Sequence, residues 1–159
     1  MSISLRAGRP EDVPTILRFI EGLAEYEKLS HACVATEAHL TATLFGDRRY
    51  AEVLLAFWNE QPAGFALFFH NYSTFLAKPG IYLEDLFVDP ALRGKGLGKA
   101  LLIALAKLAV ERNCGRLEWS VLDWNEPSIQ FYKNLGAAPM DEWTGYRLTG
   151  EALNSLATP

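Results

Sequence analysis

The spacing of apolar residues changes from a helical to a β-type pattern near position 50 of the chain. Alternating apolar and polar residues over Ile3–Ala7 predict a short strand. From Val13 onward, apolar residues recur every three or four positions, which predicts an amphipathic helix that ends near residues 26–28. A second, shorter helix is expected to begin after Thr36, an N-cap residue type, and to end at residues 45–47.

A series of β-rich segments follows, separated by short connections. Tyr50–Trp58 and Ala63–Phe69 are rich in aromatic and apolar residues, and the connection between them contains Pro62. A connection this short predicts an antiparallel hairpin. Gly80–Val88 is the third strand in the series, and the dipeptide Asp89–Pro90 ends it.

The second half of the chain alternates helices with strands. The long helix expected from Leu97 carries apolar residues on more than one side, so it should be buried on more than one side. We predict a strand over Arg116–Leu122, a helix over Pro127–Leu135 and a last strand over Trp143–Leu148. A strand, a helix and a second strand in succession require a right-handed crossover between parallel neighbours, whereas the earlier hairpin is antiparallel. The sequence therefore predicts an α/β (or α+β) domain with a mixed sheet.

The composition fits one folded domain over residues 1–159. Hydrophobic residues make up 50% of the 159 residues, enough to bury a core without disulfides or metals. The chain has 19 acidic and 15 basic residues, a net charge of -4, which disfavours nucleic acid as a partner. Neither the cysteines, Cys33 and Cys114, nor the three histidines have metal-ligand spacing, so we expect no metal and a reducing, cytoplasmic location. No apolar run is long enough to anchor the chain in a membrane.

The most informative segment joins the strand that ends at Val88 to the helix that begins at Leu97. Glycines alternate with other residues there, so the backbone can turn tightly with its N–H groups facing one point at a helix N-terminus. The cations Arg93, Lys95 and Lys99 add the positive charge that suits a pyrophosphate. A flexible turn with solvated cations is the alternative. The spacing matches neither a P-loop nor a dinucleotide-binding fingerprint, which disfavours NTP and NAD as ligands.

Three motifs carry a resemblance to a known family. Arg93-x-x-Gly96-x-Gly98 resembles the acyl-coenzyme A motif of the GNAT N-acetyltransferase superfamily. Tyr82–Val88, Trp124–Lys133 and Ala24–Lys28 are similar to segments of the diamine (spermidine/spermine) and thialysine acetyltransferases. The resemblance implies a GNAT fold, a twisted, mixed and mostly antiparallel sheet with helices on both faces. It also implies acetyl-CoA as co-substrate and a homodimer.

The same resemblance implies which residues contact the coenzyme. The strand before the loop pairs with pantetheine, the loop amides hold the pyrophosphate, and the later helix supplies a tyrosine near the thiol. By position these are Leu86, Phe87 and Val88 for pantetheine, Arg93, Gly94, Lys95, Gly96, Leu97, Gly98 and Lys99 for pyrophosphate, Asn125 for a further contact, and Tyr132 for catalysis.

Transfer of acetyl to an amine requires a base, because an alkylamine with a pKa near 10.4 is only about one part in 2500 neutral at pH 7. Glu84 and Asp85, just upstream of the loop, are candidates to hold and deprotonate the ammonium group. Strict alternation along a strand would put them on opposite faces, and a β-bulge would bring both toward the substrate. The alternative is that these carboxylates lie at the edge of the sheet, exposed to solvent. This alternative is stronger for Asp85 than for Glu84. Tyr132 is suited to protonate a leaving thiolate, or else packs in a core.

Tyr26 and Glu27 complete the predicted amine site from the end of the first helix, where a further carboxylate suits a substrate with two positive charges. Solvation of a helix end is the alternative. We therefore expect an N-acetyltransferase that moves acetyl from acetyl-CoA to a primary amine of a small polyamine, diamine or lysine-like molecule. The reaction would be direct attack in a ternary complex. The alternatives are another amine, such as an amino acid, an antibiotic or a protein N-terminus, and a coenzyme A sensor without turnover.

Overall fold

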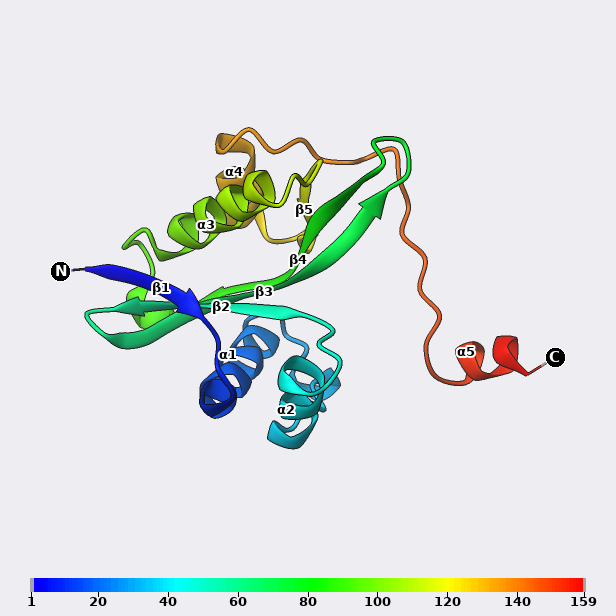
Figure 1. The fold of residues 1–159 in the computed structure, drawn as a ribbon, viewed down its shortest axis with the longest axis horizontal. Coiled ribbons are helices and arrows are strands. Elements are labelled where there is room, and N and C mark those ends of the chain that lie inside the picture. The colour runs from blue at the N-terminus through cyan, green and yellow to red at the C-terminus, as the bar shows by residue number, and fades with distance from the viewer. Residues whose placement is uncertain (1, 159) are drawn as a thin grey trace. The chain divides into compact units, whose positions relative to one another are not determined.

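A computed structural model describes residues 2–158 of the chain (Figure 1). The chain divides into two compact units, one that ends at Leu122 and one that begins at Asp123. Each unit is described by itself below. The expectation of a single domain over the whole chain stays a prediction.

A five-stranded sheet forms the centre of the first unit. Its strands lie in sequence order: β1 (Ile3–Ala7), β2 (Glu52–Trp58), β3 (Gln61–Ser73), β4 (Lys78–Val88) and β5 (Leu117–Trp119). The pairs from β1 to β4 are antiparallel, and β4 and β5 are parallel. The predicted mixed, mostly antiparallel sheet is therefore confirmed, although β5 is shorter than the strand expected over Arg116–Leu122.

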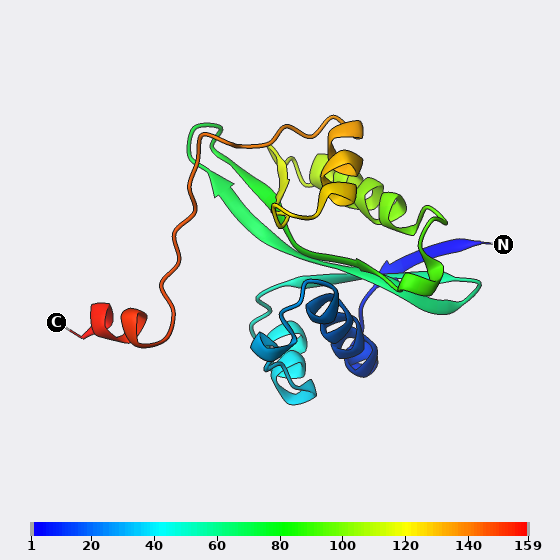
Figure 2. The same cartoon turned by 180° about the vertical axis from the view of Figure 1, so that it is seen from behind.

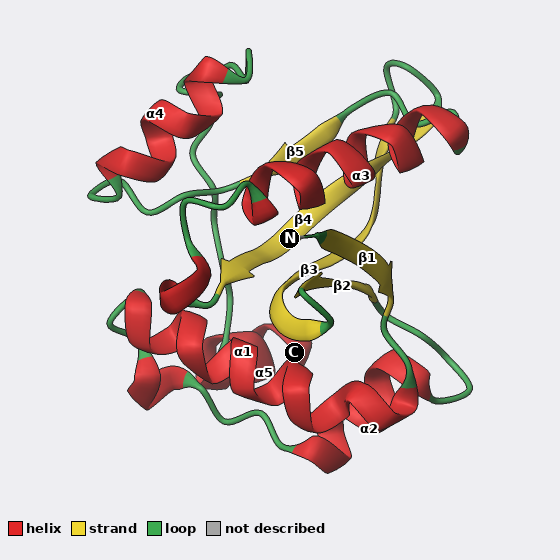
Figure 3. Ribbon diagram, turned by 90° about the vertical axis from the view of Figure 1, so that its left-hand side faces the viewer, coloured by secondary structure: helices red, strands yellow, loops and turns green. Residues whose placement is uncertain are grey.

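Helices cover both faces of this sheet, as predicted (Figures 1 and 3). The helices α1 (Val13–Tyr26) and α2 (Glu37–Phe45) lie on one face, and α3 (Leu97–Glu111) lies on the other, an arrangement that Figure 2 shows from behind. Short 3-10 turns at Pro10–Asp12, Ser30–Ala32 and Pro90–Leu92 connect the elements.

The apolar stripe of α1 forms the core on its face of the sheet. Phe19 is buried and packs against Phe65 of β3 and Phe87 of β4, with ring centroids 5.8 and 5.9 Å apart. Gly22 allows the helix to come this close, because a Cβ there would lie 2.7 Å from Cζ of Phe87. These contacts fix the body of α1 against the strand that leads to the glycine loop.

The second unit contains α4 (Glu126–Asn134) and α5 (Gly150–Ala157). Asn125 caps α4, since its Oδ1 accepts a hydrogen bond of 3.4 Å from the backbone N–H of Ser128. The predicted strand over Trp143–Leu148 is wrong: the structure has no strand there, and the helix α5 that follows was not predicted. A strand requires a hydrogen-bonding partner, and none of the described strands pairs with this segment.

None of the helices within residues 2–158 combines the length and the apolar character needed to cross a membrane.

Candidate active site

A β-bulge in β4 changes which way its acidic residues face. Asp85 pairs with Leu67 and Leu83 pairs with the next residue of β3, Phe68, so Glu84 has no counterpart. The extra residue breaks the alternation of side chains at this point. Because side chains two apart share a face, Asp85 faces the same side as Phe87, which packs against α1. From the sequence, a bulge was the condition under which both carboxylates would face the substrate. No sequence pattern indicated that the bulge is present.

Beside this bulge, Glu27 and Glu84 lie close enough to Asp85 for their charges to act on it. Glu27 directly follows α1, and Asp85 is partly buried whereas Glu84 is exposed. Burial, together with repulsion from Glu84 and Glu27, raises the pKa of Asp85 from 3.8 to about 6. Burial also raises the pKa of Glu27. The cluster therefore offers a negative field for a cation and one carboxylate that accepts a proton close to neutral pH.

Beyond the bulge, β4 has an edge with no strand beside it. The pairing with β5 covers only Ile81–Leu83, whereas β4 continues to Val88. The backbone N–H of Asp89 donates to the carbonyl of Ala63 at 2.8 Å, so it points toward β3. Along a strand, the N–H and C=O groups of successive residues point to opposite edges. Those of Leu86 and Val88 point to the other edge, where an extended ligand can pair with them as a strand would. The Phe87 side chain, in contrast, lies in the core.

The loop after β4 leads into the N-terminus of α3. Gly94 and Gly96 have φ angles of +78° and +85°, in the left-handed region that favours glycine. Gly96 is the N-cap of α3, and its carbonyl accepts the first helical hydrogen bond, from Ala100. The N–H groups of the first turn therefore lack partners within the helix and carry its positive dipole end. This geometry, with exposed Arg93, Lys95 and Lys99 around it, suits an anion.

Two cations of the loop lie over aromatic rings. The Lys95 Nζ lies 5.1 Å from the Trp58 ring centroid, at the end of β2. The Arg93 guanidinium lies 4.7 Å from the ring centroid of Tyr26, the last residue of α1, and its Nε donates to the Val88 carbonyl at 3.1 Å. The sequence gives no signal of the contact between Arg93 and Tyr26, because the two residues are far apart in the chain and meet only in the fold.

The first unit thus holds all the predicted site residues except two. Asn125 and Tyr132 belong to the second unit, where Asn125 is buried at the start of α4. Tyr132 is partly buried, with its ring centroid 5.7 Å from that of Phe131. Their predicted contacts with coenzyme and thiol stay predictions.

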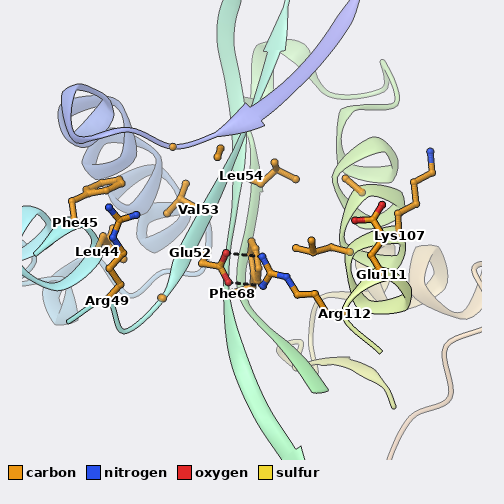
Figure 4. A pocket seen from close by; sticks show the side chains of 15 residues that line it. Leu44, Phe45, Arg49, Glu52, Val53, Leu54, Phe68, Lys107, Glu111 and Arg112 are labelled. Carbon is orange, nitrogen blue, oxygen red and sulfur yellow. Dashed lines mark hydrogen bonds and ion pairs between the residues drawn. The ribbon is translucent and has the colours of Figure 1, made fainter. Parts of the chain in front are cut away.

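A hollow of about 430 Å³ lies elsewhere in the first unit (Figure 4). It is lined by α2, β2 and α3, and by none of the predicted site residues. At its centre Arg112 donates to both carboxylate oxygens of Glu52, at 2.7 and 2.9 Å, so the two charges neutralise each other. The bulge with its carboxylates and the glycine loop with its N–H donors are together the better candidate site. Among the described residues, no three histidine, cysteine or acidic side chains are placed to hold a metal ion.

Comparisons with known proteins agree with this architecture. The model of the acetyltransferase (GNAT) family matches residues 20–137. Thialysine N-epsilon-acetyltransferase of Sus scrofa is 37% identical over 98% of each chain. L-ornithine N5-acetyltransferase NATA1 of Arabidopsis thaliana is 36% identical over 96% of this chain and 86% of its own. The solved integron cassette protein VCH_CASS6 of V. cholerae superimposes with a TM-score of 0.85 at 28% identity, covering 100% of this chain and 99% of its own.

The predicted family is therefore confirmed by a family model that matches most of the chain and by relatives similar over nearly their full length. GNAT acetyltransferases take their acetyl group from acetyl-CoA. The chain belongs to the acetyltransferase (GNAT) family and is an enzyme that transfers an acetyl group to an amine.

Proposed function

We propose that this enzyme acetylates a primary amine of a small polyamine, diamine or lysine-like molecule. The observation that carries the proposal is the cluster of Glu27, Glu84 and Asp85, which a bulge in β4 and the end of α1 bring together. Repulsion among clustered carboxylates is relieved when a cation binds between them, and more so by a substrate with two positive charges. The names of the porcine and Arabidopsis relatives, which specify thialysine and ornithine, support the same class of amine.

In this proposal acetyl-CoA binds along β4 after the bulge and at the loop that follows the strand. The outward peptide groups of Leu86 and Val88 pair with the pantetheine amides, and the N–H groups of the loop and of the first turn of α3 hold the pyrophosphate. The cations Arg93, Lys95 and Lys99 add charge to that subsite. Two opposite local fields then sort the two substrates, with phosphates drawn to the loop and ammonium groups to the carboxylates.

The reaction is direct attack within a ternary complex. The ammonium group gives a proton to Glu84 or Asp85, directly or through water, and the freed nitrogen lone pair forms a bond to the thioester carbonyl carbon. The tetrahedral intermediate then collapses, the C–S bond breaks, and the thiolate takes a proton from the Tyr132 hydroxyl, which solvent restores. An alkylamine at pH 7 needs about 4.6 kcal/mol to be neutral. The Asp85 carboxylate, with a pKa of about 6, is a stronger base than an ordinary aspartate for this step.

A homodimer in the cytoplasm is also part of the proposal. Trp143, Tyr146 and Leu148 expose large apolar side chains in one segment of the second unit. Contact with a second copy would cover these side chains. The two free cysteines fit a reducing compartment. Light scattering at micromolar concentration is expected to return twice the mass of one chain, and the mass of one chain would contradict the dimer.

A panel of amines tests the substrate class. Release of the coenzyme A thiol from acetyl-CoA is measured with a diamine, with thialysine and with a monoamine that has a neutral tail of equal length. The diamine is expected to be preferred, and Glu84→Gln and Glu27→Gln should reduce that preference. Glu111 is an exposed carboxylate on α3, so Glu111→Gln serves as the matched control and should keep the preference. An unchanged preference in both cluster variants would place the substrate among other amines.

A further inference from the structure

One side chain contacts both halves of the proposed site. Arg93 belongs to the loop that leads into α3, yet its guanidinium lies 4.7 Å from the Tyr26 ring centroid and 5.8 Å from that of Phe87. Its Nε also donates to the carbonyl of Val88 at 3.1 Å. Tyr26 ends α1 and is followed by Glu27 of the carboxylate cluster. Arg93 therefore joins the coenzyme edge of β4 to the helix end that carries part of the amine site.

The contact with Val88 occupies the open edge of β4. Because the Asp89 N–H is bonded to β3, the Val88 carbonyl points to the edge that β5 leaves uncovered. A ligand that pairs with this edge must compete with the Arg93 guanidinium for the space around that carbonyl. The phosphates of a coenzyme offer the guanidinium stronger, charge-assisted hydrogen bonds than a single carbonyl does. Coenzyme binding thus favours movement of the Arg93 guanidinium from the Val88 carbonyl to the phosphates.

The contact with Tyr26 acts on the end of α1. The body of this helix is fixed by Phe19 against Phe65 and Phe87 and by the close approach at Gly22. The last turn lies beyond these contacts, and the stacked guanidinium is part of what holds it. Departure of the guanidinium from the Tyr26 ring would therefore loosen Tyr26 and the residue that follows it, Glu27.

We propose that Arg93 is a positioning residue that couples the two substrate sites. In the free enzyme its side chain covers the Val88 carbonyl and holds Tyr26. When the coenzyme binds, the guanidinium turns to the phosphates, and the end of α1 closes Glu27 on the amine. The coenzyme and the amine therefore strengthen each other's binding, by about two- to fivefold for a cation–π contact of this exposure. This inference rests on the proposed function and adds a link between its two sites.

Calorimetry measures the coupling directly. Coenzyme A is titrated into the protein with and without saturating 1,3-diaminopropane, and the ratio of the two dissociation constants is the coupling factor. The wild-type factor is expected to be about two to five. Arg93→Lys keeps the charge but loses the planar stack and the Nε donor, so its factor should fall to about one. Tyr26→Leu should also give about one, whereas Tyr26→Phe keeps the ring face and should keep the coupling.

Each result decides the proposal. A factor of one in the wild type overturns the coupling, and so does a wild-type factor that persists in Arg93→Lys. Loss of coupling in Tyr26→Phe would assign the effect to the hydroxyl and contradict the stacking argument. If Tyr26→Leu does not fold, Arg93→Lys decides alone, because Arg93 is exposed in a loop. A wild type that binds no coenzyme A contradicts the proposed function itself, whereas normal binding and turnover with a factor of one contradicts only the coupling.

Discussion

Replacing Asp85 by asparagine should stabilise the protein at neutral pH, although it removes a carboxylate of the proposed site. Burial and the neighbouring carboxylates Glu84 and Glu27 raise the pKa of Asp85 from 3.8 to about 6. Between these two pH values the folded state binds more protons than the unfolded state does. The free energy of unfolding therefore falls as the pH rises through this range and stays low above it. Asparagine keeps the shape of the side chain without the charge.

The size of the effect follows from the two pKa values. At about 1.4 kcal/mol for each pKa unit, the difference between 3.8 and about 6 corresponds to roughly 3 kcal/mol. About half of this loss is expected by pH 5 and all of it by pH 7.5. The buried amide of asparagine needs hydrogen-bond partners, so we expect a gain of about 1–3 kcal/mol at pH 7.5. Each kcal/mol raises the Tm of a chain of this size by about 2–4 °C.

Urea unfolding of the wild type and the variant between pH 5 and 7.5 provides the test. Asp12→Asn is a control of opposite sign, because two hydrogen bonds from Arg6, at 2.7 and 2.9 Å, lower the pKa of Asp12. That variant should be less stable than the wild type by the same amount from pH 5 to 7.5, because the Asp12 contribution is lost only below pH 3.8. The reasoning is refuted if Asp85→Asn is also destabilised at pH 7.5, or if its advantage does not grow from pH 5 to 7.5.

Three further substitutions test the packing, the loop and the chemistry. Gly22→Ala should destabilise the fold by about 1–3 kcal/mol in urea unfolding, because its Cβ meets the Phe87 ring at 2.7 Å. Gly98→Ala, whose Cβ has its nearest contact at 3.9 Å, should be neutral or stabilising, and equal losses would contradict the contact. Gly96→Val, at a φ of +85°, should weaken coenzyme A binding more than tenfold by calorimetry, and unchanged affinity in a folded variant would exclude the loop as the anion site. Tyr132→Phe should lower kcat by about 10²-fold with nearly intact affinity for acetyl-CoA, and undisturbed turnover would leave Tyr132 a packing residue.

The sequence by itself determined the features that depend on a few consecutive residues. The strands and helices of the first unit follow from the period of apolar residues, because a side chain's face depends only on its place in a helix or strand. The loop from Arg93 to Lys99 was identified for the same reason: glycines with left-handed φ angles and the start of a helix are features of a few consecutive residues. The motifs around this loop were also sufficient to identify the family.

The tertiary structure decided whatever depends on pairing between distant segments. The bulge at Glu84 exists only in the register between β3 and β4, and that register turns Asp85 toward α1 and beside Glu27. The raised pKa of Asp85 follows from this placement, since burial and neighbouring charge are properties of the fold. A strand was expected over Trp143–Leu148, but this segment has no partner among the described strands. The hydrogen bonds that define a strand are made to another segment of the chain, so only the tertiary structure decides whether one forms.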